Sequence, residues 1–310
     1  MIGLLSRRAG WSLLVLCAVA TTTFIGTLKV GDPVRTLAGP HASARDRAHV
    51  RQFYGLDRPV YVQYGRYMSH LVRGDLGRSY RYREPVALLI GQRLPRTAML
   101  ALMAILIEVT LGVTFGTIAA ARKGSSIDTL VMSNSFLLMS LPTFVSGQLI
   151  LMVFAYYTGW FPIGGYGVGF WDHLYHAILP ATTLALLSAA FYARMTRNEM
   201  IEILQADYIR TARAKGARGA AVVLRHGLRN ALLPIVTSLG SSFGALFSGA
   251  IVTEAIFAWP GMGRLVFESI TGWDVPVIVG CALVGSFGIL LGNFLSDMTY
   301  ALLDPRIRRE

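Results

Sequence analysis

The chain has 310 residues, of which 54% are hydrophobic and 15% charged, and its formal net charge is +12. A soluble chain carries about 25% charged residues, so this composition and a mean hydropathy of +0.51 favour a membrane protein. The positive charge fits contact with anionic lipid headgroups better than nucleic-acid binding, which needs a solvated basic fold. The two cysteines lie in apolar runs and the histidines follow no ligand spacing, so no disulfide framework, metal site or catalytic site is predicted.

Six apolar runs are candidate membrane-spanning helices, for which about 20 residues are needed. They are residues 10–28, 97–121, 130–157, 176–192, 231–253 and 275–301. The sequence therefore predicts an all-α, polytopic membrane protein with six transmembrane helices. Arg7 and Arg8 precede the first run, but no clean small-residue cleavage site follows it. We interpret residues 1–30 as a retained transmembrane anchor.

The placement of Lys and Arg predicts that both termini lie in the cytoplasm. In that orientation 15 of the 29 basic residues fall in the cytoplasmic pieces, which are residues 1–9, 122–129, 193–230 and 302–310. The short outer loops 158–175 and 254–274 hold only Arg264. The outer stretch 31–96 carries twelve arginines, but long loops cross largely regardless of charge.

An amphipathic helix is predicted within the outer stretch. Pro59 marks a plausible start and Gly74 a plausible stop. Between them apolar residues recur at helical spacing: Val60, Tyr61, Tyr64, Tyr67, Met68, Leu71 and Val72. We interpret this helix as an element near the membrane surface that braces the outer face. A docking surface for a substrate-delivering partner is the alternative, and the two roles are compatible.

Small residues and prolines in the apolar runs predict tightly packed helices, because small residues let backbones approach closely. The fifth run holds Gly240, Ser241, Ser242, Gly244 and Gly249, and the prolines at or in the runs are Pro142, Pro180, Pro234 and Pro276. Two intramembrane acids are candidate polar sites. Glu108 fits a helix–helix hydrogen bond or the transport path, and Asp297 an ion pair with Arg306 or a helix cap.

The segment 193–230, between the fourth and fifth runs, is too long for a simple turn. Asp207 is predicted to N-cap a short helix that ends at Gly216. A solvated basic loop and a helix that enters a groove of another protein remain equally open. The candidate contact residues are Asp207, Tyr208, Arg210, Thr211, Ala212, Arg213, Ala214, Lys215 and Gly216.

This segment closely resembles the cytoplasmic coupling loop of permeases from ATP-binding-cassette (ABC) importers of the dipeptide/oligopeptide/nickel family. The resemblance extends over nearly the whole chain. It includes Gly31-Asp32-Pro33, residues 54–59, Gln63-Tyr64, residues 74–79, Glu254, Phe257, Pro260-Gly261, Gly263, Leu265 and residues 304–308. Many other ABC importer permeases begin this loop with Glu-Ala-Ala. Arg210-Thr211-Ala212 stands here instead, which is similar to the peptide-family variant.

The resemblance implies an ABC importer type I-like permease fold. Its parts would be an anchor helix (1–30), an external region (31–96), a five-helix core that includes the loop 193–230 (97–303), and a cytoplasmic tail (304–310). It implies a multi-pass protein of the bacterial inner membrane that is not an enzyme. No Walker A sequence occurs in the chain, so ATP and Mg²⁺ would bind partner ATPase subunits, and this chain itself would bind no cofactor.

The implied partners are a second homologous permease, two cytosolic ABC ATPases, an external substrate-binding protein and membrane lipid, without nucleic acid. The implied cargo is di- or oligopeptides, with nickel chelates or glutathione as alternatives. The helix at 207–216 would couple to an ATPase. The resemblance also implies an external gate at Glu254, Phe257, Trp259, Pro260, Gly261 and Gly263.

Other interpretations remain open at this point. The gate residues also fit a plain turn braced by Trp259 at the membrane interface. A gradient-driven secondary transporter would show repeats and a charged midplane site, but no repeat is found and only Glu108 lies in the middle of a run. A membrane enzyme would need clustered His, Asp or Glu residues, which the sequence lacks.

Overall fold

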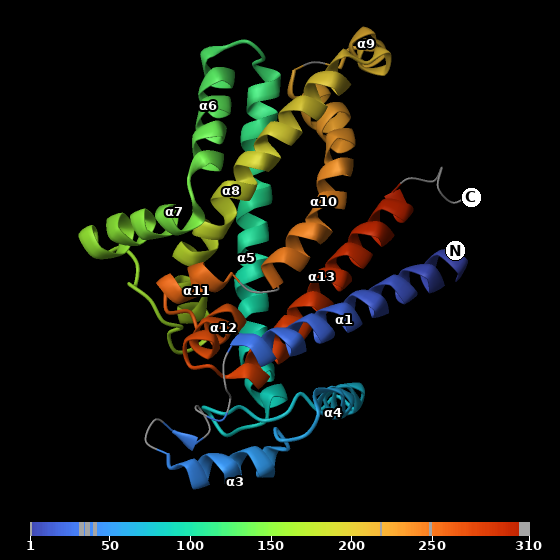
Figure 1. Cartoon of the computed structure of the whole chain (residues 1–310). Coiled ribbons are helices and arrows are strands. Elements are labelled where there is room, and N and C mark those ends of the chain that lie inside the picture. The colour runs from blue at the N-terminus through green and yellow to red at the C-terminus, as the bar shows by residue number, and fades with distance from the viewer. Residues whose placement is uncertain are drawn as a thin grey trace.

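The computed structural model describes residues 2–30, 34, 38–39, 42–217, 219–247 and 250–303. Within these residues the chain is helical, as predicted, and one isolated antiparallel bridge joins Arg78 to Pro85. The α-helices, labelled in Figure 1, are α1 (Ile2–Val30), α3 (Ala44–Tyr54), α4 (Val60–Val72), α5 (Val86–Ala121), α6 (Ser126–Ser140), α7 (Thr143–Ile150), α8 (Phe170–Gln205), α9 (Asp207–Ala214), α10 (Arg229–Phe247), α11 (Ile251–Ile256), α12 (Met262–Thr271) and α13 (Val275–Leu303). Two π-helices, η1 (Leu151–Tyr157) and η2 (Val222–Leu228), follow α7 and precede α10.

Three described helices are long and apolar enough to cross a membrane: α5, α8 and the Val275–Ser296 part of α13. α5 and α8 contain the second and fourth predicted runs, and the apolar part of α13 covers residues 275–296 of the sixth. The pair formed by α6 and Thr143–Tyr157 is a fourth candidate if it is counted as one broken span. The apolar part of α1, Gly10–Gly26, is shorter than these helices.

The predicted third and fifth runs are not single straight helices. The third bends by 106° between α6 and α7, where Leu141 is extended before Pro142. Proline forces the preceding residue out of the α conformation and lacks an N–H group, so the helix breaks at this point. In the fifth, α10 ends at Phe247 and α11 begins separately at Ile251.

Helix α8 is much longer than the predicted fourth run of 176–192. It begins at Phe170 and continues to Gln205, with Pro180 in its interior. The predicted cytoplasmic segment 193–230 therefore begins as part of a long helix. A single helix leads from the loop that precedes Phe170 to the start of α9 (Figure 1).

Glycines determine how closely the long helices pack. A Cβ atom added to Gly116 of α5 would lie 2.5 Å from the Ala193 carbonyl oxygen of α8. A Cβ atom on Gly240 of α10 would lie 2.5 Å from the Gly292 carbonyl oxygen of α13. Only glycine fits where one backbone meets another at these distances, so the prediction of tight packing is confirmed at these two contacts.

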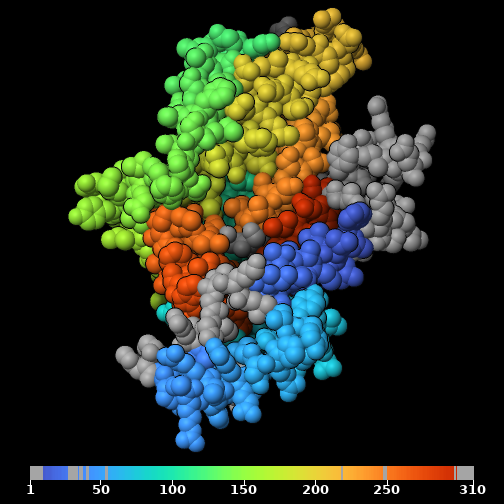
Figure 2. Space-filling view, in the orientation of Figure 1, coloured from blue at the N-terminus to red at the C-terminus, as the bar shows by residue number. Residues whose placement is uncertain are grey.

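The predicted amphipathic helix is confirmed as α4, which begins after Pro59 and is followed by Gly74 with φ +76°. Its residues Tyr67, Met68 and Leu71 pack against a cluster from α1 and α13. This packing agrees with a bracing role. Together with α3, α4 forms the end of the molecule opposite α9 (Figures 1 and 2).

Some predicted features lie outside the described residues. They are Gly31-Asp32-Pro33, Gly249 and the tail 304–310. Asp297 belongs to α13, but its side chain and the predicted ion pair with Arg306 also lie outside the described part of the chain.

Candidate functional sites at the two ends of the molecule

Helix α9 stands at one end of the molecule and presents most of its side chains outward. One residue, Ile209, is completely buried, and it fixes the helix to the rest of the chain. The Asp207 and Arg210 side chains are 95% and 77% exposed and approach each other to 3.5 Å. An exposed pair of this kind adds little stability, so the outward charges are available to another molecule.

The ends of α9 differ in part from the prediction. Ala206 is the N-cap residue in an extended conformation, and Asp207 is the first helical residue without a side-chain capping hydrogen bond. Asp207 instead places a negative charge in the first turn, where the helix dipole favours it. The predicted stop is confirmed, because Gly216 has φ +91°, a conformation that glycine adopts without strain.

Two contacts hold the surroundings of α9 in place. The Asn230 side-chain nitrogen donates to the Tyr208 hydroxyl at 2.9 Å, which joins α9 to the start of α10. In the part of α8 that leads to α9, Arg197 donates from two nitrogens to the two Asp128 carboxylate oxygens, at 2.6 and 2.7 Å. This pair joins α8 to α6. Such two-pronged pairs fix orientation as well as distance.

The predicted gate residues lie toward the other end, around a group of hydrogen-bonded residues that we call the Glu254 cluster. Both Glu254 oxygens accept hydrogen bonds: Oε1 from Thr97 at 2.9 Å and Oε2 from the backbone N–H of Arg264 at 2.9 Å. Thr97 Oγ1 also accepts from the Met262 backbone N–H at 2.7 Å. A Cβ atom on Gly261 would lie 2.4 Å from Glu254 and 2.5 Å from Thr97, so a larger residue there would displace the hydrogen-bonded side chains.

Trp259 does not brace this loop at the membrane interface, which corrects one of the two alternatives. Its side chain is completely buried, and its Nε1 donates to the Arg96 carbonyl at 3.2 Å. Phe257 is buried as well, at 2% exposure, and Pro260 accepts a long 3.5 Å hydrogen bond from Arg96. Gly263 lies against Ile251, where its Cβ position is 2.8 Å from backbone atoms. All the predicted gate residues except the half-buried Pro260 are therefore buried, and Phe257 packs in a separate apolar cluster with Ala155 and Leu179.

Sequence reasoning missed a second part of this end, in which hydrogen bonds clip the loop before α5 to α12 and to Asp274 at the start of α13. The carboxylate of Asp274 is completely buried. It accepts a short hydrogen bond from the Ser79 hydroxyl and further bonds from the backbone N–H groups of Tyr80 (3.0 Å) and Arg81 (3.2 Å). The available signal was an acidic residue directly before an apolar run.

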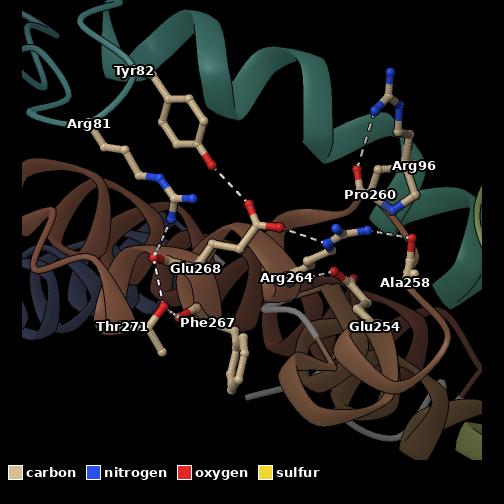
Figure 3. A network of polar contacts seen from close by, with 10 residues as sticks. All are labelled: Arg81, Tyr82, Arg96, Glu254, Ala258, Pro260, Arg264, Phe267, Glu268 and Thr271. Atoms are coloured by element: carbon tan, nitrogen blue, oxygen red, sulfur yellow. Dashed lines mark hydrogen bonds and ion pairs between the residues drawn. The ribbon is translucent and has the colours of Figure 1, made fainter.

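Glu268 of α12 is the centre of the adjoining network in Figure 3. It accepts from the Tyr82 hydroxyl at 2.8 Å and from Arg264 Nε at 2.7 Å, while its backbone carbonyl accepts from Arg81 at 3.2 Å. Burial alone would raise the pKa of Glu268, but the hydrogen bonds from Tyr82 and Arg264 lower it below its ordinary value. The contact therefore stabilises the fold above about pH 4.5 and weakens as the pH falls below that value.

Replacement of Asp274 by alanine tests the clip. The Ser79 hydroxyl and two backbone N–H groups lose their acceptor, and a buried unsatisfied group costs about 1–3 kcal/mol. We expect a lower thermal unfolding midpoint in detergent and faster hydrogen exchange over residues 78–85. Asp57→Ala, which removes an exposed carboxylate of the same region, should leave both measurements close to wild type. Equal effects of the two variants would contradict the clip.

Glu108 is completely buried in the middle of α5. The hydroxyl groups of Ser188 in α8 and Ser242 in α10 face it, but neither carboxyl oxygen forms a hydrogen bond of good geometry with a described residue. Glu108 therefore lies where α5, α8 and α10 meet, and its helix–helix hydrogen bond stays a prediction. Ser242 instead pairs with the Tyr192 hydroxyl at 2.8 Å.

The described residues contain no group of three or more His, Cys, Asp or Glu side chains that could hold a metal ion. The chain combines long apolar helices with the outward-facing helix α9 at one end and the Glu254 cluster toward the other. The three long apolar helices indicate a membrane protein.

The chain belongs to the family described as binding-protein-dependent transport system inner membrane component. The family's main domain matches residues 112–309, and its N-terminal domain matches residues 1–101. The protein is therefore a multi-pass inner-membrane permease subunit of an ABC importer, and it is a transport subunit rather than an enzyme.

Three relatives illustrate the similarity. The oligopeptide transport system permease protein AppB of Bacillus subtilis (strain 168) is 38% identical, over 97% of this chain and 98% of its own length. A putative peptide transport system permease protein of Brucella abortus (strain 2308) is 41% identical over 99% of both chains. The glutathione transport system permease protein GsiC of Salmonella paratyphi A is 41% identical, over 95% of this chain and 94% of its own.

Proposed function

We propose that this permease forms a translocation path for di- or oligopeptides together with a second homologous permease. An external binding protein delivers the peptide, and two cytosolic ATPases, which hold ATP and Mg²⁺, supply the energy. The observation that carries this proposal is the full-length similarity to relatives named as oligopeptide and peptide transport permeases. Glutathione, itself a small peptide, is the second candidate cargo because a relative named for glutathione transport matches equally well.

In this proposal the chain has six membrane spans and a type I-like permease fold, with both termini in the cytoplasm. Besides α5, α8 and α13, the spans are α1, the bent pair α6–α7 with η1, and α10. The apolar stretch Gly10–Gly26 supports α1, and the close packing of Gly240 against α13 supports α10. α9 is then cytoplasmic, and α3 and α4 are external.

The two ends of the molecule then have different tasks. α9 enters a groove of one ATPase, which is supported by its single buried anchor Ile209 and its outward-facing charges. The Glu254 cluster closes the outer end of the path. ATP binding shifts the permease pair between inward- and outward-facing states only because the ATPases bind the two states with different affinity.

Reconstituted uptake tests this function. The permease is assembled with its partner subunits in liposomes, and uptake of a radiolabelled dipeptide, a pentapeptide and glutathione is compared with ATP and with a non-hydrolysable analogue. We expect saturable peptide uptake that needs both ATP and the binding protein. Uptake driven by an ion gradient without the ATPases would instead identify a secondary transporter.

A further inference from the structure

None of the apolar side chains of helix α6 is fully buried within this chain. Of its 15 residues only Asp128 and Ser135 are buried, and both are polar. The Ser135 hydroxyl donates to the Val131 carbonyl of the same helix at 2.8 Å, so it does not attach α6 to a neighbour. A helix is ordinarily held in place by a buried apolar stripe, which α6 lacks. Its attachment to the other helices therefore depends strongly on polar contacts.

Asp128 is attached to α8 through both of its carboxylate oxygens. Arg197 donates from Nε to Oδ1 at 2.6 Å and from Nη2 to Oδ2 at 2.7 Å. The Asp128 and Arg197 side chains are 6% and 22% exposed, so salt screens this pair much less than it screens the exposed pair of α9. Oδ2 also accepts from the Gly124 backbone N–H at 2.9 Å, which ties the turn before α6 into the same contact. The pair thus fixes both the distance and the orientation of α6 relative to α8.

A second arginine of α8 reaches α6 toward the opposite end of that helix. The Arg194 guanidinium lies 4.5 Å from the centre of the Phe136 ring, and its Nη1 lies 3.5 Å from the Met139 sulfur. A cation over an aromatic ring is attracted to the negative face of that ring. Contacts with arginines of α8 therefore extend along α6 from its first turn to its last.

The position of Arg197 links this contact to α9. Arg197 lies about two turns before the end of α8, and α9 begins directly afterwards at Asp207. At its other end α6 turns into α7, where a Cβ atom on Gly147 would lie 3.7 Å from the Phe257 side chain. Helix α6 thus connects the part of α8 that leads to α9 with α7, which contacts the predicted gate residue Phe257 (Figure 1).

We propose that the Asp128–Arg197 pair is a positioning element of transport, which makes α6 follow α8 when an ATPase displaces α9. This inference rests on the proposed function and adds the contact that carries the displacement from α8 to α6 and α7. Energetic coupling between distant sites is carried by rigid helices and ion-pair networks. With the pair intact, α8 and α6 move as one unit. Without it, α6 keeps only the Arg194 contacts and half-buried apolar residues, and it lags behind α8.

Uptake per ATP hydrolysed tests the pair in the complete transporter in liposomes. The probes are the radiolabelled dipeptide, pentapeptide and glutathione that test the proposed function. The double variant Asp128→Asn/Arg197→Gln removes both charges, so that no buried charge is left without its partner. We expect its uptake per ATP to fall about fivefold or more, a usual size for coupling between sites, while ATP hydrolysis stays within about twofold of wild type. Arg197→Lys keeps the charge but loses the two-pronged geometry, and its uptake per ATP should be intermediate.

Spin labels show directly whether α6 follows α8. They are attached at Thr129→Cys in α6 and Gln205→Cys in α8, two exposed positions, in a complex whose other accessible cysteines are replaced. With the pair intact, the distance between the labels should be the same with and without a non-hydrolysable ATP analogue. In the double variant this distance should change when the analogue binds. A loss of overall stability alone would not produce a change that depends on the nucleotide.

The controls are Arg122→Gln and Glu202→Gln, which remove exposed charges from α5–α6 and α8 and should leave uptake per ATP unchanged. A double variant with wild-type uptake per ATP contradicts the inference. A parallel loss of uptake, ATP hydrolysis and unfolding midpoint also overturns it, because the pair would then only support the fold. If the wild-type transporter shows no ATP-driven uptake, the proposed function itself fails, while the spin-label comparison still decides whether α6 follows α8.

Discussion

Leucine in place of Gly116 or Gly240 is expected to prevent the permease from reaching its packed fold. Even a Cβ atom at Gly116 would lie 2.5 Å from the Ala193 carbonyl oxygen, and one at Gly240 would lie 2.5 Å from the Gly292 carbonyl oxygen. The obstacles are backbone atoms of the neighbouring helix, which cannot rotate away. Overpacking commonly costs about 1–3 kcal/mol, and we expect more than about 3 kcal/mol at these two positions.

The measurement is the thermal unfolding midpoint in detergent, together with the yield of monodisperse protein. Gly91→Leu is the matched control, because Gly91 is also in α5 but an added Cβ would meet nothing within 4 Å. Leucine is a better helix former than glycine by up to about 1 kcal/mol, so Gly91→Leu should be neutral or slightly stabilising. Similar losses at Gly91 and Gly240 would show that the helix–helix contacts are looser than described.

Tryptophan in place of Ala214 is expected to uncouple ATP hydrolysis from uptake. Ala214 is exposed at the end of α9, so a large side chain there leaves the anchor Ile209 in place but blocks entry of α9 into a close-fitting groove. Ala212 is half-buried, which makes it a less specific position for this test. We expect peptide uptake in liposomes to fall about tenfold or more, equivalent to about 1.4 kcal/mol or more of lost coupling.

The control for this prediction is Ala87→Trp, an exposed alanine near the other end of the molecule. It introduces the same side chain and should leave uptake near the wild-type level. The unfolding midpoint of both variants should match wild type. If Ala214→Trp takes up peptide normally, α9 is not the coupling element, even though the chain remains a permease of this family.

Local signals in the sequence were sufficient for the two short helices that matter most. Pro59 and Gly74 bound α4, and Gly216 ends α9, because proline and glycine impose their own backbone preferences wherever they occur. The prediction that Asp207 caps the helix was wrong by a single position. Ala206 adopts the extended conformation that a cap requires, so the aspartate moves one position into the helix.

Hydropathy located apolar runs but not their geometry. It treats residues 130–157 as one segment, whereas the backbone turns by 106° before Pro142. It also ends the fourth run at Tyr192, although α8 continues for another three turns or more to Gln205, through a stretch that mixes apolar residues with four charged ones. An average over a window measures affinity for lipid, and it contains no information about the direction of the chain.

The contacts of Glu254 and of Asp274 could not be predicted from the sequence, because the residues that form them are far apart in the chain. Thr97 and Glu254 are separated by 157 positions, and Ser79 and Asp274 by 195. Nothing local in either sequence neighbourhood names its partner. Trp259 was misplaced for the same reason, since its buried position depends on the distant Arg96 carbonyl.

The length of α5 has a mechanical consequence. Its 36 residues form a helix of about 54 Å. Thr97 joins this helix to Met262 in the Glu254 cluster, and the turn into α6 follows its other end. A rod that pivots near its middle by about 5° displaces its two tips by roughly 2 Å in opposite directions. A tilt that widens one end of the proposed translocation path would therefore narrow the other end, without a change in any loop between them.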